Sequence, residues 1–270
     1  MSGEPVEDQS DLWIPLLRRL TEASPRWLVW KNVQSALTGT GDVDSVAPLQ
    51  DWVMVEREFK DWAFSNGLGP VIVCPHAPFL LFLVALSDRR PEFYELDANR
   101  RKVFLGSTLF LPHDLLPLTV MDERGFRRVR PGVEGLLKLV QNGMKRNGSP
   151  DWEGMRSKGI RELLEEDPVG VRQGAGLFGP ARGAVLRSTE AIVRGGWDRR
   201  ALLAMEAWSI ARAVGEPDAV MARIRFRIRM KRCPILTAAV KNGRRIDSDR
   251  DEWVRRVTET HQVFGAAAGH

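Results

Sequence analysis

Short apolar runs separated by turn residues dominate the first half of the chain and predict β-strands. Residues 79–86 form an uninterrupted apolar run of strand length, residues 87–91 contain turn formers, and residues 93–97 resume with strand-favouring side chains. This pattern predicts a hairpin whose second strand ends at Asp97. Residues 102–105 could supply a further strand.

The second half of the chain follows a helical period. Apolar residues recur at intervals of three and four, which is the spacing of one buried helix face, at Val133, Leu136, Leu137 and Val140. The turn-rich stretch 121–131 separates the two patterns. We therefore expect an α+β protein with two domains, a mixed sheet with flanking helices over residues 1–128 and a helical domain over residues 129–270.

Two aspartates, Asp42 and Asp44, follow a Gly-Thr-Gly turn and are the first candidates for chemistry. In a strand, residues two apart project from the same face with their Cα atoms about 6.6 Å apart. Both carboxylates could therefore reach one Mg²⁺ ion, which is usually held by one or two carboxylates together with water and substrate phosphate. Acidic pairs at strand ends are also common as solvated groups or as acceptors of turn amides.

The predicted hairpin could bring Asp97 beside this pair. Three acids on adjacent strands would make a two-metal site, in which ions roughly 3.5–4 Å apart stabilise the attacking and leaving oxygens of a displacement at phosphorus. Asp42, Asp44 and Asp97 are therefore candidate catalytic residues and candidate ligands for Mg²⁺ or Mn²⁺. Asp97 would also orient or deprotonate the attacking hydroxyl.

The order of the predicted elements resembles the nucleotidyltransferase fold of the DNA polymerase β superfamily, and more narrowly the small nucleotidyltransferase-like proteins. A strand at 27–32, a short helical link, a Gly-Asp-Val-Asp strand, a helix at 48–66 and a later acid in a hydrophobic strand follow that pattern. The match covers residues 20–110. It implies a nucleotidyltransferase-like mixed sheet in which the three aspartates bind the metal ions.

The resemblance also implies a nucleotide-binding role for residues near the first strand. Lys31 and Asn32 stand where the superfamily usually has a Gly-Ser dipeptide that helps to hold the triphosphate, and Gly41 belongs to the glycine turn before the acidic strand. The dipeptide itself is absent. Its absence favours a non-catalytic relative, whereas the retention of three acids favours catalysis.

A basic segment at 223–232 carries six basic residues in ten. It alternates basic and apolar residues as a strand would, but a helix with a buried stripe of Met221, Ile224 and Ile228 fits better. Such a segment is either a solvated face or a clamp for phosphates, because guanidinium groups bind phosphate oxygens bidentately. In the second case Arg225 and Arg229, four residues apart, share a helix face and bind nucleotide.

Composition adds few constraints. The chain has 270 residues and 43% hydrophobic content, and its 40 basic residues barely exceed its 35 acidic ones. Only Cys74 and Cys233 are present, so a disulfide framework is not expected. The acidic N-terminus does not resemble a secretion signal, and the longest apolar run is too short to span a bilayer. We expect a cytoplasmic protein without a membrane partner.

Together these patterns predict a metal-dependent, ATP-binding or other nucleotide-binding transferase. It would move a nucleoside monophosphate from a nucleoside triphosphate to a hydroxyl of a small molecule, a protein or an RNA. Two alternatives remain open, namely a non-catalytic nucleotide- or RNA-binding relative of the same fold and a toxin-like enzyme that modifies RNA.

Overall fold

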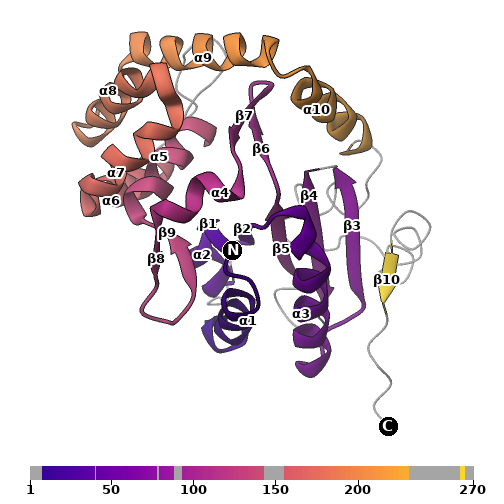
Figure 1. The fold of residues 1–270 in the computed structure, drawn as a ribbon. Coiled ribbons are helices and arrows are strands. Elements are labelled where there is room, and N and C mark those ends of the chain that lie inside the picture. Colours follow the sequence, from indigo (N-terminus) through magenta and orange to yellow (C-terminus); the bar gives the residue numbers. More distant parts are fainter. Residues whose placement is uncertain are drawn as a thin grey trace, which may run out of the picture. The chain divides into compact units, whose positions relative to one another are not determined.

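The apolar runs of the first hundred residues fold into the strands of a mixed β-sheet, and the helical pattern of the second half folds into helices (Figure 1). This computed structural model describes residues 8–39, 41–77, 79–87, 93–142, 155–230 and 262–264. The expected α+β class is confirmed. The chain divides into two units, the first comprising Met1–Arg100, Met121–Arg127 and Ile224–His270, and the second comprising Arg101–Val120 and Arg128–Arg223.

The sheet belonging to the first unit has the strand order β10-β3-β4-β5-β2-β1. The strands are β1 (Leu28–Lys31), β2 (Val43–Val46), β3 (Val71–Ala77), β4 (Leu80–Leu86), β5 (Phe93–Asn99), β8 (Thr119–Met121), β9 (Arg127–Val129) and β10 (Gln262–Phe264). Strand β2 runs antiparallel to β1 and parallel to β5, whereas β5 runs antiparallel to β4. The parallel pair joins two segments that lie far apart in the sequence.

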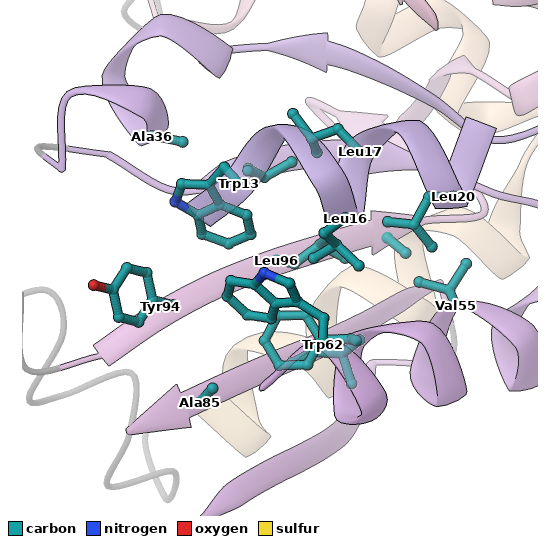
Figure 2. Packing of buried hydrophobic residues seen from close by; sticks show 14 of the residues in the cluster. Trp13, Leu16, Leu17, Leu20, Ala36, Val55, Trp62, Ala85, Tyr94 and Leu96 are labelled. Atoms are coloured by element: carbon teal, nitrogen blue, oxygen red, sulfur yellow. The ribbon is translucent and has the colours of Figure 1, made fainter. Parts of the chain in front are cut away.

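Helices cover one face of this sheet and form the core with it. The helices of this part are α1 (Ser10–Ala23), α2 (Val33–Leu37), the 3₁₀ turn η1 (Leu49–Asp51) and α3 (Trp52–Ser65). Trp13 of α1 stacks on Trp62 of α3 with ring centroids 4.9 Å apart, and Tyr94 of β5 meets both rings edge-on (Figure 2). Trp62 also donates its indole N–H to the carbonyl of Leu12 at 2.8 Å, so its one polar atom is satisfied inside the core.

The second unit is mostly helical. It contains a small sheet of β6 (Lys102–Phe104) and β7 (Ser107–Phe110), followed by α4 (Pro112–Leu115), η2 (Leu116–Leu118), α5 (Pro131–Asn142), α6 (Met155–Glu166), α7 (Pro168–Gly174), η3 (Ala175–Ala181), α8 (Arg182–Val193), α9 (Arg199–Val214) and the part of α10 (Pro217–Met230) up to Arg223. Asp167 caps α7 by accepting from the Gly170 amide at 2.9 Å, and it also accepts two hydrogen bonds from the Arg130 guanidinium.

The two units alternate along the chain, whereas the sequence predicted one division after residue 128. The β6–β7 hairpin groups with the helices because its polar contacts lie there. The Thr108 amide donates to Glu216 Oε2 at 2.7 Å, and Arg101 pairs with Asp218. These partners lie more than a hundred residues downstream, beyond the reach of any local pattern.

Most predicted elements are confirmed, including the antiparallel β4–β5 hairpin and the helix through the basic segment as far as Met230. The predicted buried stripe of that helix is wrong, because Met221, Ile224 and Ile228 are all exposed. Among the α10 side chains that the structure describes, Ala219 is the buried one. Residues 231 and 232 of the basic segment, and Cys233, lie outside the described residues.

Within the described part of the chain, no helix combines the length and the apolar character needed to cross a membrane.

Candidate metal centre

The parallel pairing of β2 with β5 places four acids on one face of the sheet. Asp44 lies directly opposite Asp97 in the register, and the preceding rung joins Val43 to Leu96, both fully buried in the core. Because side chains alternate along a strand, the acids point away from that core. Asp42 and Glu95, each two residues before Asp44 and Asp97, share their direction.

Three of these acids approach one another closely. One carboxylate oxygen each of Asp42, Glu95 and Asp97 lies within 4.8 Å of the other two. Two oxygens on opposite sides of one Mg²⁺ or Ca²⁺ ion are separated by about 4.2–5.2 Å, since each metal–oxygen distance is about 2.1–2.6 Å. The cluster therefore has the spacing and the ligand chemistry to hold a metal ion. Glu95 is 9% exposed, whereas Asp42 and Asp97 are partly exposed.

Asp44 contacts the two residues at the end of β1. Its Oδ2 atom accepts a hydrogen bond from Asn32 Nδ2 at 2.9 Å and lies 3.1 Å from Lys31 Nζ. Asp44 is only 3% exposed, so this carboxylate is neutralised by an ammonium group inside the protein. The predicted set of Asp42, Asp44 and Asp97 does lie on one face of the sheet. In the close cluster, however, Glu95 takes the place of Asp44, which pairs with Lys31 instead.

The electrostatics keep Lys31 charged. Burial acts to lower the pKa of Lys31, but the charges of Asp44, Asp42 and Asp97 and the hydrogen bond to Asp44 outweigh it and raise the pKa above its ordinary value. The ammonium group thus offsets part of the repulsion among the neighbouring carboxylates. Lys31 is therefore a charged partner of Asp44 that also attracts Asp42 and Asp97.

Local backbone geometry sets the positions of Lys31 and Asn32. The register between β1 and β2 is irregular between Val29 and Lys31, and the shift places Lys31 opposite Asp44. Asn32 follows with φ of 61°, a left-handed conformation that asparagine adopts more readily than most residues. Both side chains therefore reach Asp44 from the end of one strand.

Gly41 allows the acidic segment to approach α2. Its amide donates to the Ser35 carbonyl at 2.8 Å, and a Cβ atom at this position would lie 2.4 Å from the Cβ of Ser35. Any larger residue would push the turn and the following Asp42 away from the helix. The structure thus gives Gly41 a positioning role, and its predicted contact with nucleotide stays a prediction.

The two arginines proposed as a phosphate clamp lie on α10. Arg225 is exposed, and the side chain of Arg229 lies outside the described residues. Their contact with nucleotide therefore stays a prediction.

Glu95 is the member of the site that the sequence did not reveal. The signal was present, because Glu95 precedes Asp97 by two residues in a predicted strand, the same spacing that identified Asp42 and Asp44. What local reasoning lacked was the parallel register, which sets Glu95 beside Asp42.

Comparison with known proteins gave no relatives, because no family model, no curated protein and no solved structure matches the chain. We therefore infer a function from the geometry of the site.

Proposed function

We propose that this protein is a metal-dependent nucleotidyltransferase that moves a nucleoside monophosphate from a nucleoside triphosphate to an acceptor hydroxyl. The observation that carries the proposal is the approach of the Asp42, Glu95 and Asp97 carboxylates to within 4.8 Å of one another. Such a set of oxygen ligands suits Mg²⁺ or Mn²⁺, and Mg²⁺ sites in enzymes commonly combine one or two carboxylates with substrate phosphates.

The strand arrangement supports the resemblance to the DNA polymerase β superfamily. Strands β1 and β2 are antiparallel and are joined by a short helix and the Gly41 turn, while β2 runs parallel to the later acidic strand β5. Lys31 and Asn32 end β1, where the resemblance locates the triphosphate. In that arrangement Lys31 contributes a point charge and Asn32 an amide donor.

The proposed reaction requires little covalent chemistry from the protein. The acceptor oxygen forms a bond to the α-phosphorus, the bond from that phosphorus to the bridging oxygen breaks, and pyrophosphate leaves. A metal ion held by Asp42, Glu95 and Asp97 would supply Lewis-acid stabilisation of the phosphate oxygens. Asp97 would orient the acceptor hydroxyl and take its proton, and Lys31 would stabilise negative charge on the triphosphate.

One observation favours the alternative of a non-catalytic nucleotide-binding relative. Asp44, which the resemblance assigns to metal, is paired with Lys31 and Asn32. An ammonium group at that carboxylate competes with a second metal ion. A site with only one metal ion could bind a nucleotide without catalysing its transfer.

Labelled nucleotides separate the two functions. We expect the full chain, incubated with each α-labelled triphosphate, Mn²⁺ or Mg²⁺ and cell extract, to transfer label to an acceptor. Asp97→Asn should abolish transfer, whereas Asp61→Asn, at an exposed position on α3, should leave it unchanged. Calorimetric binding of nucleotide without transfer of label would establish the non-catalytic function instead, and absence of both metal and nucleotide binding would rule out both.

A further inference from the structure

The second unit contains a hollow of about 570 Å³ lined by arginines and one tryptophan. Trp197 lies in the turn between α8 and α9 and is 41% exposed. Around it are the exposed arginines Arg187 and Arg194 of α8 and Arg199 and Arg200 of α9. An exposed aromatic ring among several guanidinium groups is unlike an ordinary solvated helix face.

The turn that carries Trp197 is fixed at both ends. Gly195 has φ of 78°, its amide donates to the Ile192 carbonyl at 2.9 Å, and the Gly196 amide donates to the Ala191 carbonyl at 2.8 Å. These two bonds form the glycine-containing termination known as a Schellman motif. On the other side, Asp198 caps α9 by accepting from the Ala201 amide at 2.9 Å. The backbone position of Trp197 is therefore set before any ligand arrives.

The hollow has an excess of positive charge, and stabilisation of the α9 helix does not account for it. Arg199 and Arg200 occupy the first turn of α9, where the helix dipole favours acidic residues and disfavours basic ones. Two acids, Glu190 and Asp198, also line the hollow and pair loosely with arginines of α8 at 3.5 and 3.8 Å. Four arginines against two acids leave a net positive surface.

We propose that this hollow binds single-stranded nucleic acid, with a base stacked on Trp197 and the flanking phosphates held by Arg199, Arg200 and the arginines of α8. Single-stranded nucleic acids are bound by this combination, because every base offers a ring face for stacking and guanidinium groups bind phosphates bidentately. An acidic peptide would match the charge but would make no use of the exposed indole. The site goes beyond the proposed nucleotidyl transfer and does not depend on it.

Fluorescence polarisation of a labelled twelve-nucleotide single-stranded RNA with the full chain tests the proposal. Trp197→Ala should weaken binding about 5- to 150-fold, the range for loss of one stacked base, whereas Trp197→Phe should retain most of the affinity. Arg199→Ala combined with Arg200→Ala should lower the slope of log affinity against log salt by about 1.4, since each phosphate contact to a single strand contributes about 0.7. Arg172→Ala, an exposed arginine on α7, is the matched control and should stay within about twofold of the unmodified protein.

Several outcomes would overturn the proposal. Absence of RNA binding at low salt is one, and equal affinity of the unmodified protein and of a folded Trp197→Ala variant is another. If inorganic polyphosphate of matched charge displaces the RNA as effectively as an unlabelled strand does, the surface attracts polyanions only. The same measurement with single-stranded DNA distinguishes RNA from DNA as the ligand. Base stacking and phosphate contacts are available in both, so a site that uses these contacts alone should bind both.

Discussion

The two faces of the sheet in the first unit are built from the same strands but have opposite characters. On β5, Leu96 and Tyr94 pack into the helical core, while Glu95 and Asp97 point to the other face and join Asp42. The first face lowers the free energy of the folded state by burying apolar surface. The second collects like charges at distances that cost free energy without a counter-ion.

Because side chains alternate along β5, the residues that stabilise the fold and the residues that could bind metal lie on opposite faces of one strand. A shift of one residue in the register of β5 would exchange the two faces and destroy both at once. Substitutions on the core face should therefore destabilise the protein whether or not ligand is present. Substitutions on the acidic face should change stability in a way that depends on metal.

The largest effect is expected on the core face, from Trp62→Ala. The side chain is 1% exposed, stacks on Trp13 and donates a hydrogen bond to Leu12, so its loss leaves a large cavity. We expect the free energy of unfolding to fall by about 3–5 kcal/mol. Urea denaturation measures it, with Val53→Ala, at a position of the same helix that is 79% exposed, as the control. A loss below about 1 kcal/mol would show that the core does not depend on this ring.

The next effect is expected on the acidic face, from Lys31→Met. The substitution keeps an unbranched side chain one atom shorter but leaves Asp44, which is 3% exposed, without its ammonium partner. We expect a loss of about 3 kcal/mol in metal-free buffer, at the lower end of the range for broken buried pairs because Asn32 still donates to Asp44.

Saturating Mn²⁺ distinguishes this loss from a simple packing defect. The ion should restore stability to Lys31→Met more than it stabilises the unmodified protein, because it would replace the missing positive charge. Thermal unfolding with and without Mn²⁺ gives the comparison. An equal gain in both proteins would mean that Lys31 does not substitute for a cation.

Local signals predicted much of this arrangement. The uniform apolar run of β4, the turn formers after it and the strand-favouring side chains of β5 predicted a hairpin. The two-residue spacing of Asp42 and Asp44 identified one side of the acidic face. These features depend on residues close together in the sequence, where periodicity is informative.

The remainder depends on pairings across long separations. The parallel register of β2 and β5 sets Glu95 beside Asp42, and no pattern within either segment encodes that register. The same holds for the grouping of β6 and β7 with the second unit through Thr108 and Glu216. Apolar periodicity on α10 gave the helix but not its buried side, because exposure depends on what packs against the helix.

Asp167 in the second unit differs from the clustered acids of the first unit, because it accepts hydrogen bonds from a guanidinium group. The hydrogen bond from Arg130 is the main cause that lowers the pKa of Asp167, and the Gly170 and Gly132 amides act in the same direction against burial. Asp167→Ala should cost about 1 kcal/mol above pH 5, mostly through loss of the α7 cap, because solvent screens the ion pair.

The lowered pKa of Asp167 makes the stability of the protein depend on pH. A depressed folded pKa stabilises the protein above the unfolded value of about 3.9, and this contribution disappears as pH falls through the folded pKa. The difference in stability between the unmodified protein and Asp167→Ala should therefore be constant above pH 5 and shrink below pH 3.9. Urea denaturation at several pH values measures it, and a difference that grows on acidification would contradict the assignment.

The smallest expected effect has the opposite sign and comes from neutralising the acidic cluster. Glu95→Gln combined with Asp42→Asn removes two like charges that lie within 4.8 Å of Asp97. In metal-free buffer we expect the variant to be more stable by roughly 0.5–1 kcal/mol. The substitutions remove the three pairwise repulsions of the cluster, each worth about 1 kcal/mol in water, but they also remove the attraction of Lys31 to Asp42.

Metal should reverse the order of stability of the unmodified protein and the double variant. Mg²⁺ or Mn²⁺ stabilises only a folded state that binds it, so the unmodified protein gains stability as the concentration rises while the double variant does not. Thermal unfolding over a metal titration should therefore show two curves that cross. Asp61→Asn, on the exposed surface of α3, should follow the unmodified protein throughout. If the double variant is less stable at every metal concentration, the cluster is a structural element of the fold, and the difference between the two faces is one of packing alone.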